Sequence, residues 1–355
     1  MSRRVIFWDT SVSDLLNDKF FGGIAVQLLF WAKEFSKNNW EVFALTREET
    51  YVQNDIKFLR YKYFSRVAVV VEWFYVFYYL ITVKPQVIIL RGAQRILLPL
   101  AFLGRLFKTK IVFFGASDVN FQPGKEMIKG DINRKAYRMG LLKTDYIVVQ
   151  NDFQRKSLMD NYGKDSILIP NIWSVLDNTK SLEISSTIEA IWVGNLRKIK
   201  RVEWFVNLAR KYPTLSFVAV GGSTGDEDYF NECKALFAQV PNLQYLGSVS
   251  FHMSNSLIQK SKILICTSEF EGFPNTFLQA WANHVPVLST VDPSGVVTQN
   301  NLGLVAETEE QLCENLQILT NEETYKKIQI SIDEYFNKNH TSSIAYSKLL
   351  MFLNL

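Results

Sequence analysis

The sequence predicts an α/β protein of two domains, each built on a parallel β-sheet. Its 355 residues suffice for two domains of ordinary size. Short apolar runs rich in β-branched residues alternate with segments of helical spacing, a pattern typical of parallel sheets. An irregular polar stretch at 169–187 interrupts this alternation. We therefore place an N-terminal domain at 1–172 and a second domain at 188–338.

The first domain begins with a strand at Val5–Asp9, a glycine turn and a helix at Ile24–Ser36. The turn contains Gly22 and Gly23, which let the backbone approach a ligand closely, although an ordinary turn uses glycine equally well. No G-x-G-x-x-G string supports a dinucleotide site here. Further strands are expected at 41–45, 56–61, 110–114 and 146–150, with another ending at 90, and helices at 65–82, at 95–110 and from 151 onward.

The second domain opens with a strand at Ile188–Val193, a basic turn at Gly194–Arg201 and a helix at Val202–Lys211. Such a turn can hold a diphosphate, because the helix dipole, the backbone N–H groups and the side-chain charges converge there. A solvated turn would carry the same charges. Later strands are expected at 215–221, 243–246, 262–266, 303–305 and from 286, and helices at 309–319, 321–336 and 340–353.

The most informative stretch, Ser268–Leu288, combines an acidic loop, a helix and the start of a strand. Asn275 or Thr276 is expected to cap a helix at 277–282. The N-terminus of a helix suits a phosphate, and a carboxylate just before it can accept hydrogen bonds from sugar hydroxyls. Phosphate and sugar together indicate a sugar nucleotide.

The string F-E-G-F-P-N-T-F-L at 270–278 resembles the donor-site signature of retaining GT-B glycosyltransferases of family 4. In that family E-G-F-x-N opens the loop, and a second Glu follows eight positions later. Glu271 matches the first Glu, which the family places at the donor sugar. Gln279 stands where the second Glu binds the nucleotide ribose. The lost charge should weaken donor binding by about 1 kcal/mol.

The resemblance also implies a diphosphate site in the basic turn, where the family carries G-R-L-x-x-x-K-G. Lys200 matches the Lys, but Asn195 replaces the Arg, so Arg197 or Arg201 must supply the second cation, and we favour Arg197. The expected catalytic residues are Glu271, Lys200, Arg197 and Asp118. The expected donor-binding residues are Gly22, Gly23, Gly194, Arg197, Lys200, Gly222, Glu271, Gly272, Phe273, Asn275, Thr276 and Gln279.

The resemblance implies two Rossmann-like domains that face each other across a cleft, with the helix at 339–355 crossing back to the first domain. The N-terminal domain would bind the acceptor and the C-terminal domain a UDP- or GDP-sugar, with no metal and no cofactor. Retention would follow from attack on the same face of the sugar within a short-lived ion pair. Many relatives carry a His at the donor sugar, where this chain has Ser117 and Asp118. Asp118 is a candidate acceptor ligand or base, or simply a cap of the next segment.

Three departures from the family pattern keep alternatives open: Gln279, the missing His near Ser117, and His284, where relatives often have Gly. One alternative is another GT-B enzyme, such as an epimerase or a phosphorylase. The second alternative is a non-catalytic subunit that binds a nucleotide or a lipid. Asp226-Glu227-Asp228, a near match to a D-x-D metal motif, is interpreted as a solvated loop.

Charge is unevenly distributed along the chain. Residues 1–180 carry 26 Lys and Arg against 17 Asp and Glu, a net charge of +9, and the remainder carries −5. Chance would also produce such unevenness. The basic, aromatic first half favours an anionic membrane surface and shows no sign of a nucleic-acid partner.

The basic and apolar segment 95–110 is the best candidate for membrane contact, although a helix packed on the sheet would have the same composition. We expect a lipid-linked glycan acceptor in the synthesis of a bacterial surface polysaccharide, such as lipopolysaccharide or capsule.

We expect a cytoplasmic protein that is peripheral on the inner face of the cytoplasmic membrane. The chain enters its first strand directly from Met1, so no signal peptide is expected. The apolar run at 67–83 is short for a transmembrane span and contains Glu72. Three cysteines, widely separated, point to free reduced thiols, and the three histidines form no zinc cluster: the cysteines are Cys233, Cys266 and Cys313.

Overall fold

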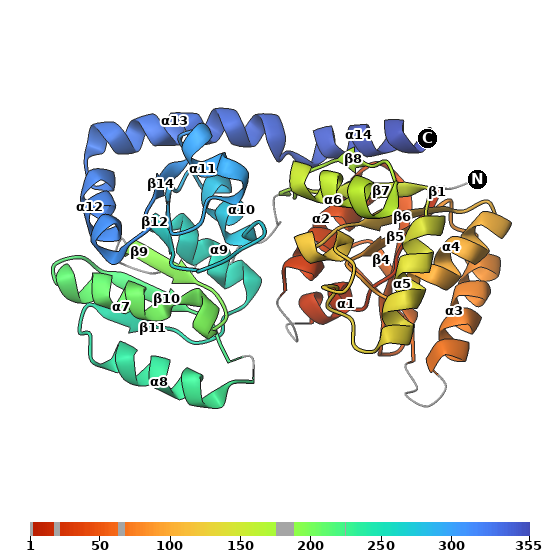
Figure 1. The fold of residues 1–355 in the computed structure, drawn as a ribbon, viewed down its shortest axis with the longest axis horizontal. Coiled ribbons are helices and arrows are strands. Elements are labelled where there is room, and N and C mark those ends of the chain that lie inside the picture. The colour runs from red at the N-terminus through yellow and green to blue at the C-terminus, as the bar shows by residue number, and fades with distance from the viewer. Residues whose placement is uncertain (1–2, 18–21, 63–67, 175–187, 224) are drawn as a thin grey trace. The chain divides into compact units, whose positions relative to one another are not determined.

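A computed structural model describes residues 3–17, 22–62, 68–174, 188–223 and 225–355 (Figure 1). The chain divides into two compact α/β units. Unit 1 comprises Met1–Ser174 with His340–Leu355, and unit 2 comprises Val175–Asn339. The expected helix start at Ser65 and most of the polar stretch before 188 lie outside the described residues.

Unit 1 is built on an eight-stranded sheet, counted over the described residues. Its strands are β1 (Arg3–Phe7), β2 (Trp40–Thr46), β3 (Tyr51–Gln53), β4 (Ile56–Arg60), β5 (Val87–Arg91), β6 (Lys110–Phe114), β7 (Tyr146–Val149) and β8 (Ile167–Leu168). The order is β3-β4-β2-β1-β5-β6-β7-β8, and the β3–β4 pair is antiparallel while the other neighbours are parallel. β1 therefore lies inside the sheet, with β2 on one side and β5 on the other.

Helices cover both faces of this sheet because strand side chains alternate between the faces. The helices are α1 (Ser11–Leu16), α2 (Gly23–Lys37), α3 (Ala68–Thr82), α4 (Leu97–Leu106), the 3₁₀ helix η1 (Asp118–Phe121), α5 (Asp131–Lys143), α6 (Asp152–Tyr162) and α14 (Ser342–Leu353). Ile6 belongs to the core with α3, α4 and α5, whereas Phe7 packs against Phe35 of α2 at 5.9 Å between ring centres. Phe35 also packs against Tyr346 of α14 at 5.1 Å.

Unit 2 has a six-stranded parallel sheet within its described part, in the order β11-β10-β9-β12-β13-β14. The strands are β9 (Ile188–Val193), β10 (Phe217–Val220), β11 (Leu243–Tyr245), β12 (Ser261–Cys266), β13 (Val287–Ser289) and β14 (Gly303–Val305). The helices are η2 (Lys198–Lys200), α7 (Val202–Lys211), α8 (Glu227–Ala238), α9 (Phe251–Gln259), α10 (Asn275–Ala282), η3 (Pro293–Gly295), α11 (Val296–Gln299), α12 (Glu309–Leu319) and α13 (Glu322–Asn339).

The return of the chain to unit 1 is fixed by buried polar contacts. The Nδ1 atom of the fully buried His340 lies 2.7 Å from the carbonyl oxygen of Asn171. Trp173 donates its backbone N–H to the carbonyl of His340 at 2.9 Å. Because a carbonyl only accepts, Nδ1 carries the proton. Burial lowers the pKa of His340 to about 4, so the ring is neutral at pH 7.

Most expected elements are confirmed, and three expectations are wrong. The strand at Ile188–Val193 and the helix at Val202–Lys211 match residue for residue. The segment expected as a helix at 95–110 is helical only at Leu97–Leu106. Asp226 is not in a solvated loop with its neighbours, because it caps α8 by accepting the N–H of Tyr229. α10 begins at Asn275, with Pro274 as its N-cap and no side-chain cap. Asn275 and Thr276 therefore lie in the first turn and do not precede it.

The cysteines are free, as expected, and all three are buried. Among the helices that the structure describes, none is both long and apolar enough to cross a membrane.

Candidate functional site

The candidate site of unit 2 lies at the carboxyl ends of β9 and β12. These strands are neighbours, but the chain continues from β9 to β10 on one side of the sheet and from β12 to β13 on the other. Loops that leave adjacent strands in opposite directions open a crevice, and ligands of open α/β sheets bind there. One loop carries the basic turn after β9, and the other carries the acidic stretch after β12.

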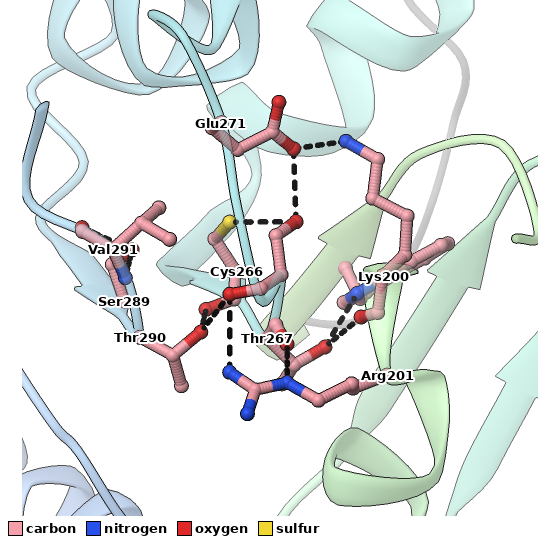
Figure 2. A network of polar contacts seen from close by, with 10 residues as sticks. Lys200, Arg201, Cys266, Thr267, Glu271, Ser289, Thr290 and Val291 are labelled. Atoms are coloured by element: carbon pink, nitrogen blue, oxygen red, sulfur yellow. Dashed lines mark hydrogen bonds and ion pairs between the residues drawn. The ribbon is translucent and has the colours of Figure 1, made fainter. Parts of the chain in front are cut away.

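An ion pair joins these two loops (Figure 2). The Nζ atom of Lys200 contacts the carboxylate of Glu271, and the Oγ atom of Ser268 donates to the same carboxylate at 2.8 Å. The two charged side chains are 25% and 18% exposed, so the pair is partly shielded from water. The structure thus brings together the cation and the carboxylate that the sequence placed at a sugar nucleotide, although 71 positions separate them.

Backbone contacts fix the geometry around the ion pair. Thr267 donates its hydroxyl to the carbonyl of Lys200 at 2.7 Å, and Trp192 of β9 donates its indole N–H to that hydroxyl at 3.2 Å. The N–H of Glu269 is bonded to the carbonyl of Ile199 at 2.8 Å. Both loops are therefore held before any ligand binds, which is the preorganisation that electrostatic catalysis requires.

Arg201 points away from the ion pair (Figure 2). Its guanidinium donates to the carbonyls of Thr267 at 3.0 Å and Ser268 at 3.1 Å, and it stacks over Trp204 at 4.1 Å. The residue has a φ of 43°, a left-handed conformation that turns its side chain under the loop. These donors hold backbone, whereas Arg197 is exposed on the preceding segment. The assignment of Arg197 as the second cation stays a prediction.

The N-terminus of α10 follows Glu271 in the same loop. Asn275 and Thr276 occupy the first turn, in which backbone N–H groups have no intrahelical acceptor. Gly272 meets no neighbour at the position of a Cβ, so packing does not require glycine there. On the same helix, Gln279 is buried, and its Nε2 has no hydrogen-bond partner within the described structure. The Nε2 amide is therefore a donor without an acceptor in the described structure, and the ribose role of Gln279 stays a prediction.

Glycines let the loops after β9 and β10 approach each other. A Cβ at Gly221, where φ is 153°, would overlap the carbonyl oxygen of Gly194, and a Cβ at Gly222 would overlap the Oγ of Ser248. These positions therefore require glycine or a displaced neighbour. Gly194 and Gly222 lie at the same edge of the sheet as Lys200.

Phe273 of the acidic loop packs against Trp281 of α10 at 6.2 Å between ring centres, and the other predicted residues belong to unit 1. Gly22 precedes α2 with extended backbone, and Gly23 is its first residue. Asp118 follows β6, and its Oδ1 accepts from Asn151 at 3.1 Å and from Gln154 at 3.0 Å. These two amides fix the carboxylate, and Asn120 supplies the side-chain oxygen that binds the N–H of Ser117 at 3.1 Å.

Sequence reasoning missed Thr267 and Ser268, which orient Lys200 and Glu271. The available signal was two hydroxyl residues directly after a buried strand and before the acidic loop. Within the residues the structure describes, no group of three or more His, Cys, Asp or Glu side chains could hold a metal ion. Metal independence is still a prediction.

Comparison with known proteins finds a glycosyltransferase family that matches most of unit 2. Residues 187–322 match the family described as Glycosyl transferases group 1. A curated relative, alpha-galactosylglucosyldiacylglycerol synthase of Streptococcus pneumoniae, is 28% identical over 124 residues, which are 34% of this chain and 33% of that protein. The match thus spans about a third of the relative's own length.

Solved structures of glycosyltransferases share the fold over the whole chain. Sucrose-phosphate synthase of Thermosynechococcus elongatus has a TM-score of 0.76 at 14% identity, covering 99% of this chain and 98% of that one. A glycosyltransferase of Rickettsia africae gives 0.75 at 15% identity, covering 99% and 97%. WaaG, a glycosyltransferase involved in lipopolysaccharide biosynthesis, gives 0.68 at 14% identity, covering 99% of each chain. The predicted GT-B fold class, two α/β domains with parallel sheets, is confirmed.

Proposed function

We propose that the chain is a retaining glycosyltransferase of family 4 that transfers a sugar from a UDP- or GDP-sugar. The observation that carries the proposal is the Lys200–Glu271 pair, set between β9 and β12 beside the N-terminus of α10. A cation and a helix N-terminus suit a diphosphate, and a carboxylate next to them suits sugar hydroxyls. The group 1 match over 187–322 supports glycosyl transfer as the reaction.

The residues would act mainly by electrostatics. Lys200, with Arg197 and the first turn of α10, would stabilise the charge that develops on the leaving diphosphate, which is usually the largest catalytic contribution. Binding of the diphosphate would draw Lys200 away from Glu271. The released carboxylate would then accept hydrogen bonds from the donor sugar and orient it for attack on the same face. This scheme uses neither a metal nor a covalent nucleophile.

The acceptor that we propose is a lipid-linked glycan of a bacterial surface polysaccharide, reached at the inner face of the cytoplasmic membrane. The name of the Streptococcus pneumoniae relative denotes a glycolipid product, which favours a lipid-borne acceptor here. Unit 1 has an apolar stripe, exposed on α3 and α4: Val70, Phe74, Phe77, Tyr78 and Ile81 with Phe102 and Leu106.

The spacing of the α3 residues places them on one face of the helix, and contiguous exposed apolar side chains commonly mark a contact surface. At the C-terminal end of α4, a cavity of about 270 Å³ is lined by Arg105, Lys108, Lys110 and Lys143, with Asp145. Apolar and cationic groups together suit a membrane that contains anionic lipid.

The test is calorimetric binding of UDP, GDP and ADP to the purified chain without added metal, followed by turnover assays. Turnover would be assayed with UDP-glucose, UDP-galactose, UDP-N-acetylglucosamine and GDP-mannose on bacterial lipid extracts. We expect one nucleoside diphosphate to bind and the matching sugar nucleotide to be consumed with retention at the anomeric carbon. Consumption without an acceptor would favour an epimerase, and binding without any turnover would favour a non-catalytic subunit. If no nucleoside diphosphate binds, the proposal is wrong.

A further inference from the structure

Arg201 occupies a backbone position that local preferences reserve for other residues. Its φ of 43° and ψ of 52° lie in the left-handed region, which glycine enters freely and a residue with a Cβ rarely adopts. It is also the N-cap of α7 without a side-chain cap hydrogen bond, where Ser, Thr, Asp, Asn or Gly is preferred. The family string G-R-L-x-x-x-K-G has its final glycine at this position. Strain of this kind persists where tertiary contacts outweigh it, and such positions cluster at functional sites.

The guanidinium of Arg201 supplies these tertiary contacts. Its Nε donates to the carbonyl of Thr267 at 3.0 Å and its Nη2 to the carbonyl of Ser268 at 3.1 Å. One planar group therefore bonds two successive carbonyls of the loop after β12. The guanidinium carbon lies 4.1 Å from the ring centre of Trp204, in the first turn of α7, and this stack holds the fork in its direction. Lysine has no such fork.

The loop after β12 also bonds the basic turn in return. Thr267 donates its hydroxyl to the carbonyl of Lys200 at 2.7 Å, and the N–H of Glu269 is bonded to the carbonyl of Ile199 at 2.8 Å. With the two bonds from Arg201, four hydrogen bonds join residues 199–201 to residues 267–269. We call these four bonds the clasp.

The clasp fixes the backbone on both sides of the ion pair (Figure 2). On one side, Lys200 directly precedes Arg201. On the other, Ser268 donates its Oγ to the carboxylate of Glu271 at 2.8 Å. The carbonyl of Ser268 accepts a second bond from the hydroxyl of Thr290, after β13, at 2.6 Å. Two donors occupy both lone pairs of this carbonyl oxygen, so Ser268 is held from two neighbouring loops.

We propose that Arg201 is a positioning residue of the donor site, which closes the clasp so that Lys200 and Glu271 are in place before the donor binds. The role rests on the proposed glycosyltransferase function. The positive charge of Arg201 is used on backbone carbonyls and not on the diphosphate. The left-handed backbone turns the side chain under the loop, so the strain and the clasp depend on each other.

The first test needs no ligand. Deuterium exchange at the Glu269 amide, followed by NMR on the full chain, reports opening of the clasp, because this N–H bridges the two loops. Arg201→Gly suits the left-handed backbone but has no guanidinium, and exchange should become about tenfold faster. Arg201→Lys keeps the charge without the fork and should open the clasp similarly. Arg210→Ala is the matched control, since Arg210 at the other end of α7 donates to the side chains of Asn207 and Gln239.

Calorimetry with UDP, GDP and ADP then measures what the clasp does for the donor. Binding of the preferred nucleoside diphosphate should weaken about tenfold in Arg201→Gly and in Arg201→Lys, and stay unchanged in Arg210→Ala. Without Lys200 the clasp has no cation to position. In a Lys200→Ala background, Arg201→Gly should therefore cost less than about twofold, whereas a direct phosphate ligand would give additive losses.

Three results would overturn the proposal. The first is unchanged exchange at Glu269 in both Arg201 variants. The second is full nucleotide affinity in Arg201→Lys, which would show that the charge alone suffices. The third is additive losses in the double variant. If the unmodified chain binds no nucleoside diphosphate, the proposed function is wrong, and the exchange rates still decide whether Arg201 closes the clasp.

Discussion

Replacing Glu271 by glutamine should separate binding of the nucleotide from binding of the sugar. In the structure Glu271 neutralises Lys200 and accepts from Ser268. Glutamine keeps an acceptor for Ser268 but removes the charge, so Lys200 loses its counterion. A nucleoside diphosphate should then bind more tightly, whereas a sugar nucleotide should lose the charged acceptor for its hydroxyls.

The magnitudes follow from the environment of the pair. Two unit charges 4 Å apart attract by about 4 kcal/mol at an effective dielectric constant of 20, and most of this is cancelled by desolvation and side-chain ordering. With side chains 25% and 18% exposed, we take a net of about 1 kcal/mol, or about a fivefold gain in nucleoside diphosphate affinity. Loss of a charge-assisted hydrogen bond to the sugar costs about 1.5–3 kcal/mol. The ratio of sugar-nucleotide to nucleoside-diphosphate affinity should therefore fall by about 10- to 100-fold.

Calorimetric titration with the nucleoside diphosphate and its sugar nucleotide measures this ratio directly. Glu269→Gln is the matched control, because Glu269 is exposed two positions earlier in the same loop. If Glu271→Gln weakens both ligands equally, the carboxylate does not distinguish the sugar from the nucleotide. If it changes neither ligand, the ion pair does not lie at the donor site.

Three further predictions concern the cation, the membrane and the return of the chain to unit 1. Lys200→Ala should weaken nucleoside diphosphate binding by about 10- to 100-fold through loss of a charge-assisted bond, whereas Lys198→Ala, at an exposed neighbour, should change it by less than about twofold. Phe74→Ser with Phe77→Ser should reduce co-sedimentation with phosphatidylglycerol vesicles, and 1 M salt should weaken binding of the unmodified chain. His340→Gln should flatten the pH dependence of unfolding between pH 6.5 and 4.

The sign of the pH effect follows from the lowered pKa of His340. Between pH 6.5 and about 4 the unfolded chain binds a proton at this residue and the folded chain does not, so acidification favours unfolding. Because burial lowers the pKa of His340 from 6.5 to about 4, the free energy of unfolding should fall by about 3 kcal/mol across this window, and the effect should be absent above pH 7. Denaturant titrations at several pH values measure it. An equal slope in His340→Gln would show that other groups cause the acid sensitivity.

Separate outcomes would contradict the other two predictions. Equal effects of Lys200→Ala and Lys198→Ala would mean that diffuse positive charge, and not one cation, holds the diphosphate. For the membrane, Ile330→Ser is the matched control, since Ile330 is an exposed apolar residue on α13 of unit 2. Partitioning to vesicles that is indifferent to salt, or equal losses in the stripe and control variants, would contradict docking through α3.

The sequence predicted the regular parts of the fold because their signals are local. Ile188–Val193 is a buried apolar run, and Val202–Lys211 has one apolar face and polar ends, so both elements match residue for residue. Short or strongly polar helices were missed: α1, α5, α8 and α9. α8 shows the physical reason, because three acidic residues in a row suggest a solvated loop. At a helix N-terminus, however, the same carboxylates accept hydrogen bonds from free backbone N–H groups and interact favourably with the positive end of the helix dipole.

The site was less predictable, because side-chain direction depends on tertiary contacts. Nothing local distinguishes Lys200 from Arg201, which are adjacent and both cationic. The left-handed backbone at Arg201 and the ring of Trp204 direct its guanidinium to carbonyls of the β12 loop, while Lys200 reaches Glu271. A cavity of about 650 Å³ in unit 1, lined by Asp9, Arg47 and Gln94 among others, was also missed, since it forms only where the ends of β1, β2, β4 and β5 meet.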